Sequence, residues 1–76
     1  MNEQADQRYA RVLDIVAAVL RIPEVEAEKS FFDLGGTSLQ ALRICARLER
    51  DLYIAARPQA LFDSESLAEF LAAACT

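Results

Sequence analysis

The chain contains no histidine and no tryptophan, and only two residues each of glycine, proline and cysteine. Without histidine it lacks Ser-His-Asp and Cys-His nucleophiles, histidine zinc ligands and the usual general base. We therefore expect neither a catalytic site of its own nor a metal site. Because 76 residues leave room for one domain, residues 1–76 are expected to form a single domain.

Positive charge is also scarce, since 8 basic residues face 12 acidic ones and the net charge is −4. A general nucleic-acid-binding protein needs clustered positive charge, so the balance argues against that class. The longest apolar run, Ile15–Leu20, is far short of the roughly 20 residues of a membrane span. The polar N-terminus is untypical of a signal peptide, and two distant cysteines fit a reducing compartment. We expect a cytoplasmic monomer that binds neither nucleic acid nor membrane.

Scarce glycine and proline, with abundant Ala, Leu, Glu and Arg, predict helices. The apolar spacing places them at about 4–21, 38–52, 58–62 and 67–75. Pro23 ends the first helix, and Asp6 is a candidate cap near its start. No segment has a strong strand pattern. The sequence therefore predicts an all-α fold, a small four-helix bundle of three main helices and a short third one, with a long loop between the first two.

Helix ends and core positions can be predicted as well. Thr37 or Ser38 is the candidate N-cap of the second helix, and Ser66 with Glu69 forms a capping-box pattern before the last one. Helical spacing on the second helix is kept by Leu39, by Leu42, by Cys45 or Ala46, and by Leu48 to Leu52. A domain this small needs its aromatic residues inside. The expected core aromatics are Phe31, Phe32, Phe62 and Phe70.

One stretch has a chemical pattern of its own. Gly35-Gly36, the only glycine pair, predicts a sharp turn, and Ser38 follows it at the start of a helix. The helix dipole there favours negative charge by roughly 0.3–1 kcal/mol, so a phosphate ester on Ser38 would be stabilised. An ordinary loop with an N-cap fits the same residues. A phosphate-binding P-loop is disfavoured because no G-K-[ST] follows, and a nucleophile elbow because G-x-S-x-G is absent.

The residues Phe31-Phe32-Asp33-Leu34-Gly35-Gly36-x-Ser38-Leu39 resemble the phosphopantetheine attachment motif of acyl and peptidyl carrier proteins. The resemblance covers most of the chain. It includes the loop proline, an Arg-Leu pair in the second helix, a Leu-Phe pair in the third and a cap before the fourth. Those residues are Pro23, Arg47-Leu48, Leu61-Phe62 and Ser66.

The resemblance implies a non-catalytic carrier. A phosphopantetheinyl transferase would move 4′-phosphopantetheine from coenzyme A onto the Ser38 hydroxyl and would supply the base for that step. The thiol of the arm would then hold an aminoacyl or acyl group as a thioester. The implied partners are the transferase, an adenylation or other acyl-loading enzyme, and downstream condensation or tailoring enzymes.

The Leu-Gly-Gly-x-Ser frame is closer to the peptidyl carriers of non-ribosomal peptide synthesis than to the fatty-acid type, which resembles Asp-Ser-Leu followed by an acidic helix. Thr37 departs from both types, because peptidyl carriers usually have His or Asp there. The alternatives are an acyl carrier of polyketide or fatty-acid type and an unmodified helical interaction domain. Partner contacts are expected at Leu34, Thr37, Leu39, Leu42 and Arg43. Arg43 would favour acidic partner surfaces.

Overall fold

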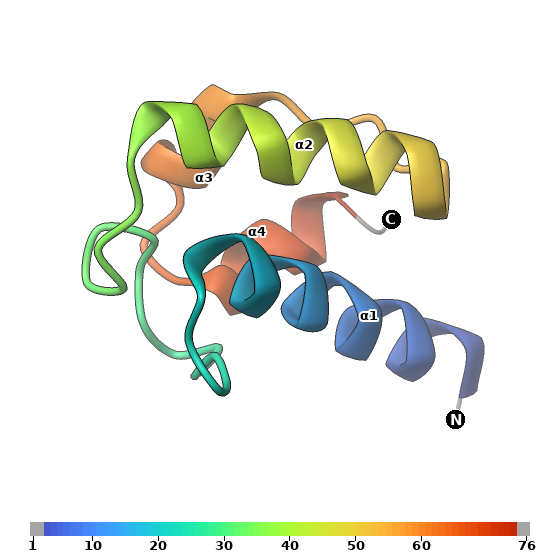
Figure 1. The fold of residues 1–76 in the computed structure, drawn as a ribbon. Coiled ribbons are helices and arrows are strands. Elements are labelled where there is room, and N and C mark those ends of the chain that lie inside the picture. Colours follow the sequence, from blue (N-terminus) through green and yellow to red (C-terminus); the bar gives the residue numbers. More distant parts are fainter. Residues whose placement is uncertain (1–2, 75–76) are drawn as a thin grey trace.

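A computed structural model describes residues 3–74, with side chains from residue 7 onward. The helices in this range are α1 (Glu3–Leu20), α2 (Ser38–Leu52), α3 (Pro58–Asp63) and α4 (Leu67–Ala74). Figure 1 shows α2 crossing above α1, with α3 and α4 behind them. The all-α four-helix bundle with a short third helix is therefore confirmed, and each helix end lies within one residue of its prediction. The predicted Asp6 cap lies outside the residues whose side chains are described.

The core is entirely apolar over the described residues. All helices and the two longer connections contribute to it, and no polar or charged side chain in this range is buried. The buried side chains are Val12, Ile15, Val16, Phe31, Ala41, Ile44, Cys45, Leu48, Ile54, Leu61, Leu67, Phe70 and Leu71. On α2, Cys45 and Leu48 are buried and Ala46 is exposed, whereas Leu39 and Leu42, which were expected as partner contacts, are each 57% exposed. Ala41 and Ile44 are the other two buried residues of α2.

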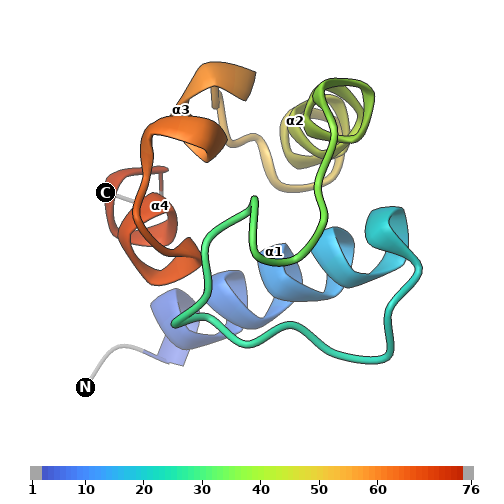
Figure 2. The same cartoon turned by 90° about the vertical axis from the view of Figure 1, so that its left-hand side faces the viewer.

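The long loop between α1 and α2 is fastened to the start of α4. The backbone N–H of Leu67 donates to the Lys29 carbonyl at 2.9 Å, and that of Ala68 donates to the Ala27 carbonyl at 2.8 Å. These N–H groups belong to the first turn of a helix, which has no acceptors for them within the helix. Figure 2 shows α2 on one side and α3 with α4 on the other, with part of the loop rising between them before α2 begins.

The predicted capping box of α4 is half correct. The Ser66 hydroxyl accepts a hydrogen bond from the Glu69 backbone N–H at 3.1 Å, as expected for an N-cap. The Glu69 carboxylate, however, accepts from the N–H of Glu65 at 3.3 Å rather than from that of Ser66. The return hydrogen bond is thus displaced by one residue, while the cap itself is retained.

The phenylalanines do not all enter the core. Phe31 and Phe70 are fully buried and Phe62 is half-buried, but Phe32 is 67% exposed, so its predicted core position is wrong. The reason is local, because Phe31 and Phe32 are neighbours in one tight turn and cannot both point inward. The Phe32 ring lies against Phe62 at a centroid distance of 5.2 Å, on the outer side of the Phe31–Phe62 contact.

Candidate functional site

The turn before α2 is closed by two hydrogen bonds. The Gly36 N–H donates to the Phe31 carbonyl at 3.0 Å, and the Gly35 N–H donates to the Phe32 carbonyl at 2.9 Å. This pair has the pattern of the Schellman motif, which requires a residue with positive φ at its centre. Gly35 has a φ of +79°, a conformation that a side chain would strain. The first glycine is therefore required by backbone conformation.

The second glycine is required by packing. A Cβ atom placed on Gly36 would overlap the ring of Phe31, which is fully buried directly against this residue. The glycine pair thus allows the chain to turn sharply while the aromatic ring fills the space beneath it. The turn that leads into α2 is consequently anchored in the core.

A reciprocal cap fixes the first residues of α2. The Thr37 hydroxyl accepts from the Gln40 backbone N–H at 3.2 Å, and the Gln40 side-chain carbonyl accepts from the Thr37 N–H at 2.9 Å. Thr37, rather than Ser38, is therefore the N-cap. The sequence interpretation missed the role of Gln40, although the T-x-x-Q spacing is itself a capping-box signal.

Because Thr37 supplies the cap, Ser38 is the first helical residue and its hydroxyl is available. Ser38 is exposed, and no hydrogen bond described for the chain involves its hydroxyl. The first turn of α2 contains no acidic residue that could act as a base. The backbone N–H groups of Ser38 and Leu39 lack acceptors within the helix and favour a negative group beside them. The site presents an accessible hydroxyl with no acidic residue beside it in the first turn of α2.

The predicted contact residues near this hydroxyl differ in how far their side chains are exposed to solvent. Thr37, Leu39, Leu42 and Arg43 are exposed, whereas Leu34 is half-buried against the core. Leu42 follows Ser38 by four residues and therefore lies on the same side of α2, one turn further along. The exposed leucines make an apolar border beside the serine.

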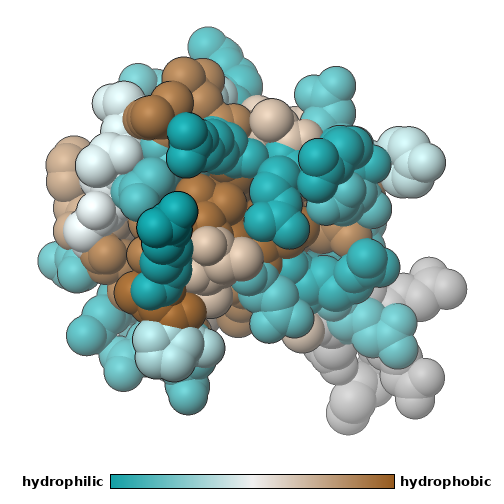
Figure 3. Space-filling view, in the orientation of Figure 1, coloured by the Kyte–Doolittle hydropathy of each residue, from teal (hydrophilic) through white to brown (hydrophobic). Residues whose placement is uncertain are grey.

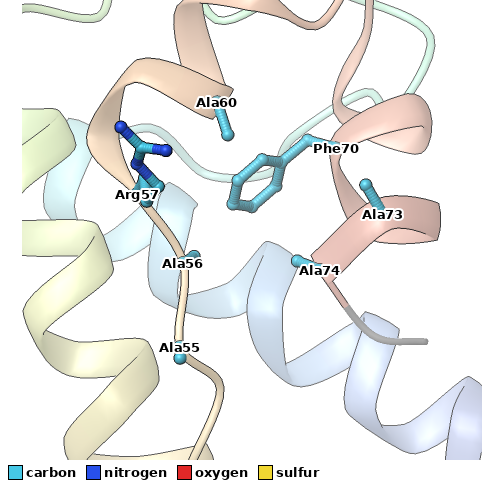
Figure 4. Close-up of a pocket in the computed structure, with 7 residues that line it drawn as sticks. All are labelled: Ala55, Ala56, Arg57, Ala60, Phe70, Ala73 and Ala74. Carbon is cyan, nitrogen blue, oxygen red and sulfur yellow. The ribbon is translucent and has the colours of Figure 1, made fainter.

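A hollow in the surface lies away from this serine. A pocket of about 200 Å³ is lined by residues of the segment after α2, of α3 and of α4, and Figure 4 shows the Phe70 ring facing it between alanine side chains. None of its lining residues belongs to the stretch 31–42. The pocket therefore does not form part of the site at Ser38.

The cysteine described in the structure is also separate from the site. Cys45 is buried on the inner side of α2, and burial raises the pKa of its thiol. A raised pKa keeps the sulfur protonated and poorly nucleophilic near neutral pH. Cys45 is accordingly a small core residue, as the sequence predicted. The described residues also contain no group of His, Cys, Asp and Glu suited to a metal ion.

Comparison with known proteins identifies the family. Residues 10–74 match the family model described as the phosphopantetheine attachment site. The chain therefore belongs to this family, as the motif in residues 31–39 implied. It is a carrier domain that bears phosphopantetheine, and domains of this family are generally non-catalytic.

The curated relatives are much longer than this chain, which matches one segment of each. The probable non-canonical nonribosomal peptide synthetase CymA of Salinispora arenicola is 44% identical over 55 residues, which cover 72% of this chain. One subunit of the linear gramicidin synthase of Brevibacillus parabrevis is 34% identical over 67 residues, which cover 88%. The chain spans only 1% of the length of each of these relatives.

A solved structure supports the fold. BlmI, a type-II acyl-carrier protein from Streptomyces verticillus involved in bleomycin biosynthesis, superposes with a TM-score of 0.81. The match covers 92% of this chain and 84% of BlmI, at 21% sequence identity. Despite this low identity, the arrangement of helices is shared. No helix in the described part of the chain is both long and apolar enough to cross a membrane.

The geometry at Ser38 is compatible with the phosphopantetheine group. The hydroxyl is exposed and unpaired within the described structure. It is not needed as the helix cap, because Thr37 caps α2. A phosphodiester there would lie beside the free N–H groups at the start of α2, which favour an anion. When bound, the group supplies a thiol on a flexible arm, while the folded chain supplies the attachment point.

Proposed function

We propose that residues 1–76 form a single carrier domain in which Ser38 is the attachment site of phosphopantetheine. The arm would hold an aminoacyl or acyl group as a thioester during the synthesis of a non-ribosomal peptide or a related secondary metabolite. The observation that carries this proposal is the division of labour at the start of α2. Thr37 caps the helix, so the adjacent Ser38 hydroxyl stays exposed and unpaired in the described structure.

The attachment step requires a phosphopantetheinyl transferase. Ser38 Oγ would form a bond to the pantetheine-side phosphorus of coenzyme A, and adenosine 3′,5′-bisphosphate would leave. The proton of the serine would pass to a base of the transferase, because the first turn of α2 has no acid and the chain has no histidine. The chain would thus be the substrate of this reaction and not its catalyst.

The partners would recognise the surface around Ser38. Carrier domains of peptide synthetases work with loading and condensation enzymes, and the exposed Leu39 and Leu42 offer such enzymes an apolar contact beside the serine. Arg43 extends this surface by one positive charge. Thr37 and Leu34 complete the proposed contact set on the side of the glycine turn. These reactions would take place in the cytoplasm.

The peptidyl type is favoured by the charge of α2. This helix contains Arg43, Arg47 and Arg50 against Glu49 and Asp51, and its first turn has no acidic residue. The fatty-acid type, in contrast, resembles a strongly acidic second helix. The enzymes proposed as partners are therefore those that load amino acids.

Intact-mass analysis after incubation with coenzyme A and a broad-specificity transferase tests the attachment site. The wild-type chain should gain one phosphopantetheine group, whereas Ser38→Ala should gain none. Thr37→Asn is the matched control, because it removes the neighbouring hydroxyl but keeps a side chain that caps helices well. This control retains Ser38 and should still gain one phosphopantetheine group when the reaction has gone to completion.

Two outcomes would overturn the proposal. Modification of folded Ser38→Ala would place the attachment elsewhere. Failure of the folded wild-type chain to gain the group would instead favour an unmodified helical interaction domain. Circular dichroism of each variant establishes that the helices are intact before the masses are compared.

A further inference from the structure

A second surface feature adjoins the surface around Ser38, with which it shares Arg43, and involves both long helices. A shallow groove of about 350 Å³ runs between the C-terminal end of α1 and the flank of α2. Its lining residues are Ala18, Val19, Arg21, Arg43, Ala46 and Arg47. None of them is acidic, although the whole chain has a net charge of −4. In Figure 3 an apolar strip between α2 and α1 is flanked by strongly hydrophilic side chains.

Two of the three arginines have no ionic partner in the described part of the chain. Arg21 and Arg43 are exposed, and neither takes part in an ion pair there. Arg21 lies just after α1 with a φ of 59°, and the N–H groups of Arg21 and Ile22 donate to the carbonyls of Ala18 and Ala17. These hydrogen bonds fix the backbone at the end of the groove, so the Arg21 side chain starts from a defined position.

The third arginine is incompletely paired. Arg47 Nε is buried without a hydrogen-bond partner in the described structure, and its nearest carboxylate oxygen, Asp51 Oδ2, is 3.9 Å away. Asp51 is engaged instead by Arg50, whose Nε donates to Oδ1 at 2.8 Å and whose Nη2 donates to Oδ2 at 3.3 Å. The Arg47 side chain is 39% exposed, so its guanidinium can still meet an acceptor from outside.

The chemistry of this groove selects for carboxylates. An arginine guanidinium forms paired hydrogen bonds with a planar carboxylate, and opposite charge both attracts a partner and rejects basic competitors. Arg43 and Arg47 are four residues apart, which separates them by about 6 Å along the axis of α2. Carboxylates four residues apart on another helix have the same spacing. The small side chains of Ala18 and Ala46 leave room for such a helix to approach.

We propose that this groove docks an acidic α-helix of a partner enzyme. Two carboxylates of that helix, four residues apart, pair with Arg43 and Arg47, and Arg21 binds a third acidic group at the end of the groove. An apolar side chain between them packs on Val19 and Ala46. The inference rests on the proposed function only in treating the partner as an enzyme that acts on the carrier. The groove itself needs no modified serine.

The probe for this proposal is a synthetic alanine-based helical peptide with glutamates four residues apart, titrated into the 15N-labelled chain. Amide shifts should change at Ala18, Val19 and Ala46, and sodium chloride should weaken the binding. Replacement of the glutamates by glutamine should abolish it. Arg21→Glu with Arg43→Glu should reduce the affinity at least about tenfold.

Arg8→Glu with Arg57→Glu is the matched control, because both arginines are exposed outside the groove and the net charge changes equally. The affinity of this control for the peptide should fall by less than half as much as that of Arg21→Glu with Arg43→Glu. An equal loss in both double variants would overturn the proposal in favour of general charge attraction. Identical shifts produced by inorganic phosphate alone would overturn it in favour of a simple anion site.

The Ser38→Ala chain separates this proposal from the attachment site. It should bind the glutamate peptide with wild-type affinity while refusing phosphopantetheine. Loss of peptide binding in folded Ser38→Ala would contradict a groove independent of the serine. Absence of peptide binding by a wild-type chain that accepts phosphopantetheine would overturn the groove and leave the attachment site intact.

Discussion

The two faces of α2 carry similar residues and have opposite roles. Leu48 on the inner face is fully buried beside Ile44, whereas Leu39 and Leu42 on the outer face are each 57% exposed. The inner face holds the helix against α1 and α3, and the outer face leaves apolar side chains beside an available serine. Exposed leucines gain nothing for the isolated fold, but they can stabilise a complex when a partner buries them.

The turn before α2 shows the same contrast between adjacent residues. Phe31 is buried against Gly36 while Phe32 is exposed, and Thr37 caps the helix while Ser38 remains unpaired in the described structure. In each pair, one residue holds the structure and its neighbour faces outward. In a chain of this size, residues that hold the fold and residues that are open to solvent thus alternate along the sequence.

The largest expected difference between the two faces concerns leucine truncation. Leu48→Ala should lower the free energy of unfolding by about 2–5 kcal/mol, because it removes buried methyl groups and leaves a cavity. Leu42→Ala should change it by less than about 0.5 kcal/mol, since the side chain is largely in solvent. Urea denaturation followed by circular dichroism measures both values. Similar losses for the two variants would show that the assignment of faces is wrong.

The outer face should matter for loading instead. Leu39→Ala should fold normally but lower kcat/KM for loading by an amino-acid-activating enzyme that accepts the wild type. Burying a leucine on docking is worth at most about 1.5–3 kcal/mol, which sets the upper limit of the effect. Leu39→Met is the control that keeps an apolar side chain and should retain most of the rate. Unchanged kinetics for Leu39→Ala would move recognition to another surface.

At the start of α2, Thr37→Ala and Ser38→Ala should lower the free energy of unfolding by different amounts. This difference should be smaller than the one between Leu48→Ala and Leu42→Ala. Thr37→Ala should cost about 1 kcal/mol because the Gln40 N–H loses its cap. Ser38→Ala should stay within about 0.5 kcal/mol of the wild type, since Ser38 is not the cap. Thermal unfolding of both variants, with Thr37→Asn as the capped control, distinguishes the roles. A larger loss for Ser38→Ala would mean that Ser38 caps the helix.

The smallest effect is expected at the exposed Asp51. Its pKa is lowered, chiefly by the side-chain hydrogen bond with Arg50, so the folded chain binds the proton more weakly than the unfolded chain. The stabilisation is therefore present above the unfolded pKa and is lost as pH falls through the folded pKa. Asp51→Asn should be slightly less stable than the wild type at neutral pH, and the two should converge in acid. A difference that does not vary with pH would argue against this ion pair.

Much of the fold could be predicted because the helix limits depend on local backbone chemistry. Pro23 disfavours continuation of α1, Pro58 suits the first turn of α3, and the glycine turn with Thr37 defines the start of α2. Such signals act within a few residues, so they are legible without the rest of the structure. The same local motif indicated Ser38 as the candidate site.

Other features depend on contacts between distant parts of the chain. One tight turn can direct only one of Phe31 and Phe32 inward, but which of the two enters the core depends on the side of the turn that meets the other helices. The division of the α2 leucines into buried and exposed has the same origin. The groove of arginines exists only because Arg21, at the end of α1, lies across from Arg43 and Arg47 on α2. Periodicity can show that a helix has two faces, but it does not state which neighbour covers each one.

The sequence by itself thus determined the helices, the sharp glycine turn and the serine that follows it, since these arise from backbone conformation and hydrogen bonds between near neighbours. Tertiary structure decided which apolar residues are buried and which charges lie together. Both outcomes depend on how segments pack against one another. A side chain is removed from water only where another segment covers it, so its burial is decided by the assembled fold.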